Sequence, residues 1–355
     1  MNRLEEINIK HDRLRGLLEA RRADALWLRA TRNIAWFTAG ADASIPVDSD
    51  TGAYSVLVTA DRRAIYTNNI ELTRLRAEED FESLGFVFEE FPWHVGGQPD
   101  LPRMITDTDA ADDLLSLRLV LLEGEVERLR ALGRDAAAAV AEAASAARPG
   151  DTEYQIAGRL AAAARARGGI AVVNLIATDE RISQFRHPLP TGKRMDKYAM
   201  VVVCMRRHGL VVSATRLAYA GALPADIAQK NQKVAAIDAA AIAATRPGRT
   251  LGEIFADIQA AYAAQGEADQ WQYHHQGGPA GYNARERIAT PGDPWVVQAD
   301  SVYAWNPSVV GCKSEDTILV TQGGFEIVSA GPETWPMIDV VVGGQTIKRP
   351  AILPL

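Results

Sequence analysis

The sequence predicts an α+β protein with a small N-terminal α/β domain at residues 1–118 and a larger C-terminal domain at residues 119–355. Three observations favour this class. Helix and strand patterns alternate in the first part of the chain, whereas the second part contains an internal repeat of helices, a loop and strands. The chain has 355 residues, of which 47% are hydrophobic, so it can bury one large core or two ordinary ones.

The N-terminal domain is expected to begin with an amphipathic helix and to continue with strands and a second helix. The helical spacing is carried by Leu4, Ile7, Leu14, Leu17 and Leu18. Short apolar runs predict strands at 25–28, 55–59 and 64–66, and a helix is expected at 71–79. The segment 91–99 is rich in proline and glycine, which predicts a loop near the domain boundary.

The C-terminal domain is expected to contain two similar halves, because its helix signals occur twice. In each half a long helix ends at an Arg-Pro-Gly turn, and a capping box then starts a second helix. These signals are 148–150, Thr152 and Gln155 in the first half, and 246–248, Thr250 and Glu253 in the second. A histidine-containing loop and a two-strand segment follow, at 185–188 and 198–219 and again at 273–276 and 302–320. We expect the four strands to form one curved sheet, with helices on its outer face and a ligand site on its inner face.

Composition excludes several classes of function. The net charge of -7 provides no basic surface for nucleic acid. The apolar runs are too short and too interrupted by charge to span a membrane, and no signal peptide is recognisable, so we expect a cytoplasmic protein. Two cysteines, Cys204 and Cys312, cannot form a disulfide framework or a zinc site of recognisable spacing.

Four short segments carry most of the chemistry. They are 187–190, 213–216, 274–282 (HHQGGPAGY) and 305–317, which contains Trp-Asn-Pro-Ser and Lys-Ser-Glu-Asp-Thr. Their order and spacing resemble those of the family of creatinase, aminopeptidase P, prolidase and methionine aminopeptidase (peptidase family M24). The resemblance implies a duplicated "pita-bread" C-terminal domain, preceded by a smaller creatinase-like domain, and it implies a homodimer.

The resemblance also shows that most metal ligands of the family are replaced. Metallopeptidases of this family hold two divalent ions with two Asp, one His and two Glu. The first Asp position falls on Val202 or a neighbour and the second on Ser213. The first Glu position falls on Asn306, and only His275 and Glu315 match. A binuclear centre needs anionic oxygen ligands, so we expect no metal and no other cofactor.

Creatinase implies a different use of the same scaffold, because it acts without a metal ion. Its proton-transferring His lies in a loop that corresponds to 186–188, so His187 is the first candidate for acid–base catalysis. The two glutamates that hold the guanidinium of creatine fall on Thr215 and Asn306. Creatine is therefore not the expected substrate.

The remaining candidate pocket is basic and polar, which favours a small anionic substrate. We expect metal-independent hydrolysis of a carbon–nitrogen bond in a carboxylated amide, cyclic amide or amidine. Glu315 is the expected base toward water, and His275 or His187 protonates the leaving nitrogen. The expected substrate-binding residues are Arg186, Ser213, Thr215, Arg216, His274, Tyr282, Asn306 and Lys313, with Arg216 or Arg186 as the carboxylate anchor.

Three alternatives stay open at this point. They are a lyase, isomerase or cyclase on the same scaffold, an inactive binding protein, and an Xaa-Pro metallopeptidase. A single ion held by His275, Glu315 and Cys204 would favour the last of these. Arg216 has a second interpretation as a partner of Glu315 in a buried ion pair, and Cys204 is interpreted as a core residue.

Overall fold

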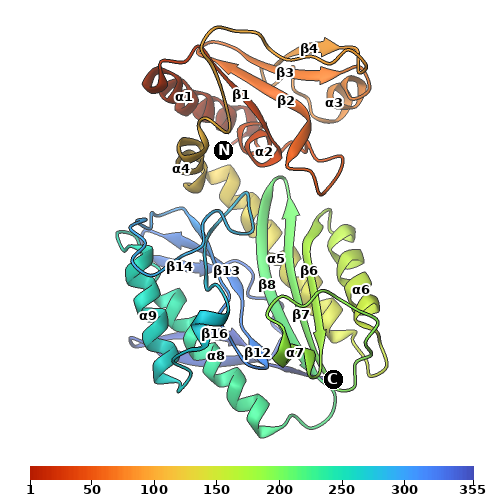
Figure 1. Ribbon diagram of the computed structural model, residues 1–355, viewed down its shortest axis with the longest axis vertical. Helices are drawn as coiled ribbons and strands as arrows, with labels where there is room; N and C mark the ends of the chain where they lie inside the picture. The colour runs from red at the N-terminus through yellow and green to blue at the C-terminus, as the bar shows by residue number, and fades with distance from the viewer. The chain divides into compact units, whose positions relative to one another are not determined.

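The computed structural model describes residues 1–355, which form two compact units. The N-terminal unit comprises Met1–Arg128 with His208–Leu210, and the C-terminal unit comprises Leu129–Arg207 with Val211–Leu355 (Figure 1). Both units mix helices and strands, which confirms the predicted α+β class. No helix combines the length and the apolar character that a membrane span requires.

The N-terminal unit is built around one five-stranded sheet with the strand order β4-β3-β2-β1-β5. Its elements are α1 (Arg3–Arg21), β1 (Ala25–Ala30), α2 (Thr31–Phe37), β2 (Thr51–Thr59), β3 (Arg63–Asn68), α3 (Leu72–Glu78), β4 (Val87–Phe91), β5 (Met104–Thr106) and α4 (Ala111–Leu119). Asn2 and Glu5 form a capping box at the start of α1, so the helix begins where two polar side chains satisfy its free N–H groups. The predicted first helix, three strands and second helix are confirmed.

The C-terminal unit contains two four-stranded sheets and the helices of the two repeated halves. The elements from α5 onward are α5 (Glu123–Ser145), α6 (Glu153–Ala166), β6 (Ile170–Thr178), α7 (Arg181–Gln184), β7 (Tyr198–Arg207), β8 (Leu210–Tyr219), α8 (Ala225–Ala244), α9 (Leu251–Ala264), η1 (Gln270–Tyr273), β9 (Gly277–Ala280), β10 (Val302–Trp305), β11 (Ser308–Val309), β12 (Cys312–Lys313), β13 (Asp316–Thr321), β14 (Gly324–Ile327), β15 (Met337–Val342), β16 (Gln345–Pro350) and β17 (Leu353–Pro354). In Figure 1 the green strands β6, β7 and β8 lie side by side, and α6 packs against β6.

The predicted repeat is confirmed by the starts of α6 and α9. Thr152 and Thr250 each cap the helix that follows, and each belongs to a complete capping box. The same two residues form isolated antiparallel bridges, Thr152 with Arg194 and Thr250 with Val296. Each half therefore secures the start of its second helix to a later segment of its own half.

An ion pair accompanies each of these helix starts, with the charges reversed between the halves. Asp151 binds Arg159 at 2.6 Å in the first half, and Arg249 binds Asp257 at 2.6 Å in the second. The basic residue lies on the helix in the first half and in the preceding turn in the second. The two halves thus keep the position of the ion pair, but the acidic and the basic residue have exchanged places.

The expected single curved sheet is divided into two sheets. One has the order β17-β8-β7-β6 and the other has the order β14-β13-β10-β9. Strand β8 approaches the segment before β13 through only a few bonds. The backbone N–H of Thr215 donates to the carbonyl of Glu315 at 3.1 Å, but that of Ser213 donates to the side chain of Thr317 at 2.9 Å. A side-chain hydroxyl replaces a backbone partner there, so the hydrogen-bond ladder is interrupted.

Two glycines in helices of the C-terminal unit are expected to respond in opposite directions to substitution by alanine. A Cβ atom at Gly133 in α5 would lie 2.2 Å from the carbonyl oxygen of Val328. We expect Gly133→Ala to lower the free energy of unfolding by about 1–3 kcal/mol, because the backbone must move apart. A Cβ atom at Gly158 in α6 would have no atom within 4 Å. Gly158→Ala should therefore raise the free energy of unfolding by about 0.5–1 kcal/mol, because alanine has the higher helix propensity. Urea unfolding measures the free energy of unfolding of both variants. If both variants changed it in the same direction, the close packing at Gly133 would be contradicted.

Candidate active site

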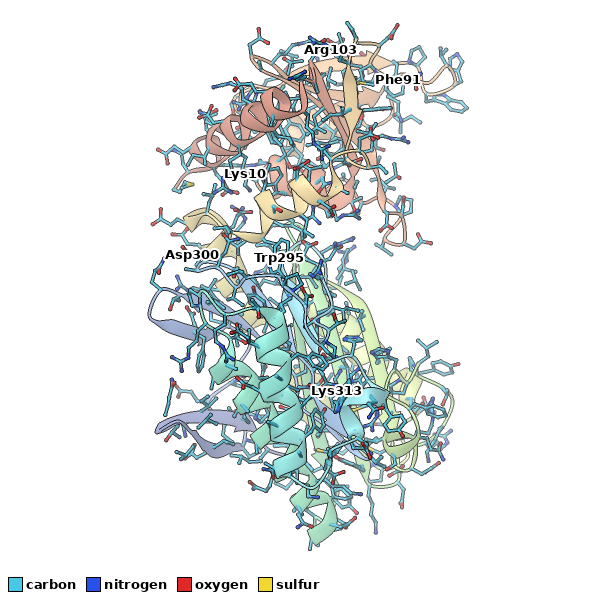
Figure 2. All side chains as sticks on the ribbon, turned by 60° about the vertical axis from the view of Figure 1, so that its left-hand side comes forward. Lys10, Phe91, Arg103, Trp295, Asp300 and Lys313 are labelled. Atoms are coloured by element: carbon cyan, nitrogen blue, oxygen red, sulfur yellow. The ribbon has the colours of Figure 1, made fainter.

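The C-terminal unit contains a cavity of about 480 Å³ that gathers many of the predicted site residues. Its polar lining consists of His187, His275, Arg285, Asn306, Lys313 and Glu315. Figure 2 shows Lys313 between the ribbon of the green strands and that of the blue-green second half. The cavity therefore brings together residues from both halves of the repeat.

The segment 313–316 points alternate side chains to opposite sides, as an extended chain does. Lys313 and Glu315 line the cavity. Ser314 and Asp316 instead contact Arg349, which is fully buried on the other side. The polar wall of the cavity is thus supported from behind by a second set of buried charges.

Glu315 is held by three donors and is not suited to act as a base. Its Oε2 accepts from the ammonium of Lys313 at 2.8 Å and from the hydroxyl of Thr215 at 2.7 Å. Its Oε1 accepts from Arg285 at 2.9 Å. Burial alone would raise the pKa of Glu315, but the charges of Lys313 and Arg285 outweigh burial and lower its pKa to about 2. A carboxylate this acidic takes up no proton near neutral pH, so the expected role of Glu315 as base is replaced by a role as anchor for two cations.

Arg285 is a site residue that the sequence analysis did not predict. Its side chain is only 11% exposed, and its guanidinium donates to the hydroxyl of Ser213 at 3.1 Å as well as to Glu315. Ser213 and Glu315 stand at two of the positions that the resemblance assigns to metal ligands. The guanidinium therefore links two side chains that a metal ion would have linked. Its only sequence signal was its place in the loop that follows 274–282.

Three histidines form a cluster beside these charges. Nε2 of His187 lies 3.1 Å from Nε2 of His274, and the rings of His274 and His275 have centroids 4.9 Å apart. Burial, followed by the charge of Lys313, lowers the pKa of His274 to about 2. Burial, followed by the charge of Arg285, lowers the pKa of His275 to about 4. Burial and Lys313 also lower the pKa of His187. The three rings are therefore neutral at pH 7.

The hydrogen bonds of His274 fix which nitrogen of His187 is basic. The amide of Asn306 donates to Nε2 of His274 at 3.3 Å, so this nitrogen carries no proton. The proton between the two Nε2 atoms consequently belongs to His187, and Nδ1 of His274 donates to the hydroxyl of Ser308 at 3.1 Å. A neutral His187 then has its lone pair on Nδ1.

Several buried polar atoms of the cavity lining have no hydrogen-bond partner. They are Nδ1 of His275, Oδ1 of Asn306 and Nε of Arg285. Orphaned polar atoms at a buried site are costly unless a ligand or water satisfies them. The set comprises one acceptor, one donor and one imidazole nitrogen.

The rest of the lining is mostly apolar. It consists of Val173, Leu175, Leu189, Val202 and Ala284. Leu189 is 71% exposed, so the cavity opens to solvent beside it. Cys204 also lines the cavity, but burial raises the pKa of its thiol, which therefore stays protonated.

Six of the eight expected binding residues do not line the cavity, and three of these six have their contacts elsewhere. Arg216 is fully buried and its guanidinium pairs with Asp316 at 3.1 Å, so it neither anchors a carboxylate in the cavity nor pairs with Glu315. Arg186 donates to the carbonyl of Val309 and to the side chain of Gln270, both at 2.6 Å. Tyr282 is buried next to Glu286, which accepts from its backbone N–H at 3.0 Å. Ser213, Thr215 and His274 lie just behind the lining and contact it through Arg285, Glu315 and His187.

Comparison with known proteins identifies the family. The model of metallopeptidase family M24 matches residues 127–322, and that of the creatinase/prolidase N-terminal domain matches residues 10–132. The chain belongs to metallopeptidase family M24. The prolidase from Pyrococcus horikoshii OT3 has a TM-score of 0.75 at 17% identity, covering 92% of this chain and 99% of that chain. The X-Pro aminopeptidase from Thermotoga maritima MSB8 has a TM-score of 0.75 at 16% identity, covering 97% and 99%. These likenesses confirm the pita-bread fold of the M24 family.

One curated protein is similar in sequence. It is the agropine synthesis cyclase of Rhizobium rhizogenes, which is 26% identical over 212 residues. The match covers 51% of this chain and 52% of that protein, so the chain spans about half the length of this relative. The name of that protein describes it as a cyclase.

The M24 residues present here do not fit a binuclear metal centre. At the five positions that the resemblance assigns to ligands, Val202, Ser213 and Asn306 supply no anionic oxygen. Glu315 already has both oxygens bound to cations or a hydroxyl, and His275 alone retains a free nitrogen. Two cationic side chains, Lys313 and Arg285, pair with Glu315 instead.

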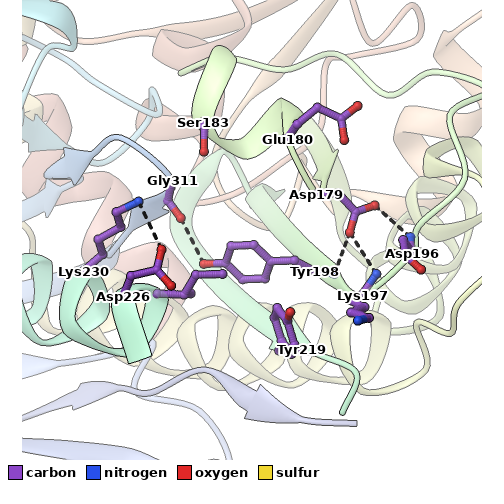
Figure 3. A pocket seen from close by; sticks show the side chains of 11 residues that line it. Asp179, Glu180, Ser183, Asp196, Lys197, Tyr198, Tyr219, Asp226, Lys230 and Gly311 are labelled. Atoms are coloured by element: carbon purple, nitrogen blue, oxygen red, sulfur yellow. Dashed lines mark hydrogen bonds and ion pairs between the residues drawn. The ribbon is translucent and has the colours of Figure 1, made fainter. Parts of the chain in front are cut away.

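A second pocket of about 280 Å³ lies beside β7 and the start of α8, and Figure 3 shows its side chains. Asp179 dominates its polar lining, but its carboxylate accepts from the backbone N–H groups of residues 196–198 at 2.8–2.9 Å. The hydroxyl of Tyr198 donates to the carbonyl of Gly311 at 3.1 Å. These contacts secure the chain turn at residues 196–198.

Proposed function

We propose that this M24 protein is a metal-independent hydrolase that cleaves a carbon–nitrogen bond in a small carboxylated amide, cyclic amide or amidine. The observation that carries the proposal is the charge of the cavity. Lys313 and Arg285 contribute two positive charges, Glu315 contributes one negative charge, and the histidines are neutral. The buried site has one positive charge in excess, which favours a ligand with one carboxylate.

Each polar group then has a role that its contacts support. Nε of Arg285 has no partner and binds the substrate carboxylate, while Lys313 has donors left to polarise the scissile carbonyl. Oδ1 of Asn306 accepts from the substrate N–H group. The apolar residues of the lining, such as Val202 and Leu175, receive the uncharged body of the substrate.

Proton transfer is assigned to the histidines, of which His187 is the most exposed. Nδ1 of His187 takes a proton from water as the water oxygen attacks the carbonyl carbon. Lys313 stabilises the negative charge that develops on the carbonyl oxygen. The carbon–nitrogen bond then breaks, and the leaving nitrogen receives the proton through the imidazole of His187 or His275.

A second candidate function is ring closure, which the similarity to a protein named as a cyclase favours. The same cations and imidazoles would activate a carbonyl toward a hydroxyl or amine of the substrate itself instead of water. Hydrolysis and ring closure differ only in the nucleophile, so the cavity supports both. Homodimer formation and a cytoplasmic location stay predictions of the sequence analysis.

One experiment tests the function and separates the two candidates. Protein treated with EDTA and desalted is incubated with a panel of N-acyl amino acids, cyclic amides and carboxylated amidines, in water labelled with heavy oxygen. We expect hydrolysis that inserts one labelled oxygen into the released acid, at a rate that EDTA does not change. A ring-closed product without label would favour the cyclase. A rate that is lost with EDTA and restored by Mn²⁺ or Co²⁺ would contradict the proposal.

A further inference from the structure

We propose that His187, His274 and His275 form a binding site for one transition-metal ion of the Zn²⁺, Cu²⁺ or Ni²⁺ class, and that an ion bound there inhibits the enzyme. This site differs from the binuclear centre of M24 metallopeptidases. His187 and His274 are not at ligand positions of that centre, and three neutral imidazoles replace a set of ligands that is mostly carboxylate. The inhibition rests on the function proposed above, whereas the binding does not.

The spacing of the ring nitrogens supports a single ion. One ring nitrogen of each histidine lies within 4.8 Å of the other two. Two nitrogens that each lie about 2.0–2.1 Å from a tetrahedral Zn²⁺ are about 3.3 Å apart. The two Nε2 atoms of His187 and His274 are 3.1 Å apart, so this pair already has about the separation that one ion requires.

The residues around the histidines orient them as ligands. Nδ1 of His274 contacts the hydroxyl of Ser308 at 3.1 Å, which leaves Nε2 directed at the centre of the cluster. Ser308 is itself held, because its backbone N–H donates to the hydroxyl of Tyr262 at 2.9 Å. Nδ1 of His275 is buried without a partner, so an ion would satisfy a group that the protein leaves unpaired.

The ligand set selects the class of ion. Three neutral imidazoles suit Zn²⁺, Cu²⁺ and Ni²⁺, whereas Mg²⁺ and Ca²⁺ need oxygen ligands that the cluster does not contain. Lys313 and Arg285 lie in the same cavity and repel a cation, which weakens the site relative to one rich in carboxylates. The open coordination positions face the cavity, since His187 and His275 both line it.

Occupation of this site would remove the groups that move protons. An ion bound at Nε2 of His187 requires the ring proton to move to Nδ1, so Nδ1 loses the lone pair that accepts the proton of water. The ion also takes a lone pair of His275, so Zn²⁺ should act as an inhibitor that EDTA reverses. Binding and inhibition are therefore measured separately.

Binding is tested with the EDTA-treated, desalted protein. Co²⁺ is titrated and its visible absorption bands are followed, and Zn²⁺ is then added as competitor. We expect one ion per chain in the wild-type protein. His187→Asn removes a ligand and should weaken binding at least about 10-fold, and Ser308→Ala, which removes only the orienting hydroxyl, should weaken it about 10-fold. His94→Asn, which removes an exposed histidine outside the cluster, should leave the affinity unchanged.

Each outcome decides a separate point. Equal affinities for His187→Asn and His94→Asn, or no saturable binding of Co²⁺, would overturn the site. One-to-one binding together with activation of turnover by Zn²⁺ would keep the site and overturn both the inhibition and the metal-independent reaction. If no substrate of the panel is turned over, the proposed function fails, but the Co²⁺ titration still decides the site.

Discussion

Arg349→Met should lower the free energy of unfolding of the C-terminal unit by about 3–5 kcal/mol, because it leaves a buried carboxylate without a counter-charge. Arg349 binds Asp238 of α8 at 2.6 Å and Asp316 at 2.7 Å, and all three side chains are fully buried. Asp316 retains Arg216 at 3.1 Å, whereas no other cation pairs with Asp238. Urea unfolding followed by circular dichroism measures the loss.

Two further variants test whether charge is the cause. Asp238→Asn combined with Arg349→Met removes the unpaired charge and should recover part of the stability. Lys348→Met changes the neighbouring residue, whose ion pair with Asp339 is exposed, and should alter stability by no more than about 0.5 kcal/mol. If the double variant is no more stable than Arg349→Met, the loss comes from packing and not from charge.

His187→Gln should lower kcat by about 10²–10⁴-fold on the best substrate of the panel, because it removes the group that accepts the proton of water. His187 is exposed at the cavity, so the substitution should leave the fold intact. The cations that bind the carboxylate are not changed, so KM should stay within about 3-fold of the wild-type value. Steady-state kinetics on EDTA-treated protein measure both constants.

The control is His94→Gln, which removes an exposed histidine that does not line the cavity and should leave both constants unchanged. A large rise in KM with an unchanged kcat in His187→Gln would assign His187 to substrate binding and contradict its role in proton transfer.

Local signals predicted much of the fold. The capping boxes at Thr152 and Thr250 are set by neighbouring residues, so the sequence reveals them directly. Strand β6 was not predicted, because Ile170–Thr178 lacks the alternation of a half-buried strand. Its place is fixed by pairing with β7, which no local pattern shows. The division into two sheets likewise involves a tertiary contact, in which the hydroxyl of Thr317 accepts from the backbone N–H of Ser213.

Family motifs pointed to His187, His275 and Glu315, which the structure places in the cavity lining. The prediction was less accurate where it depended on the direction in which a side chain points. Arg216 was expected in the cavity together with Thr215, although adjacent residues of a strand point to opposite sides. Thr215 contacts Glu315 and Arg216 contacts Asp316 accordingly. The acidity of Glu315 and the presence of Arg285 depend on tertiary contacts, so the sequence alone could not assign them.

The reversed polarity of the ion pairs at the two helix starts distinguishes halves that otherwise look alike. If α6 docked on the turn of the second half, Arg159 would meet Arg249, and if α9 docked on the turn of the first half, Asp257 would meet Asp151. Each exposed pair contributes little to stability, but exchange would replace attraction by repulsion at both places. In a chain with two similar halves, equivalent helices can exchange places within one molecule or between two copies. The charges of Asp151, Arg159, Arg249 and Asp257 favour the pairing of each helix with the turn of its own half.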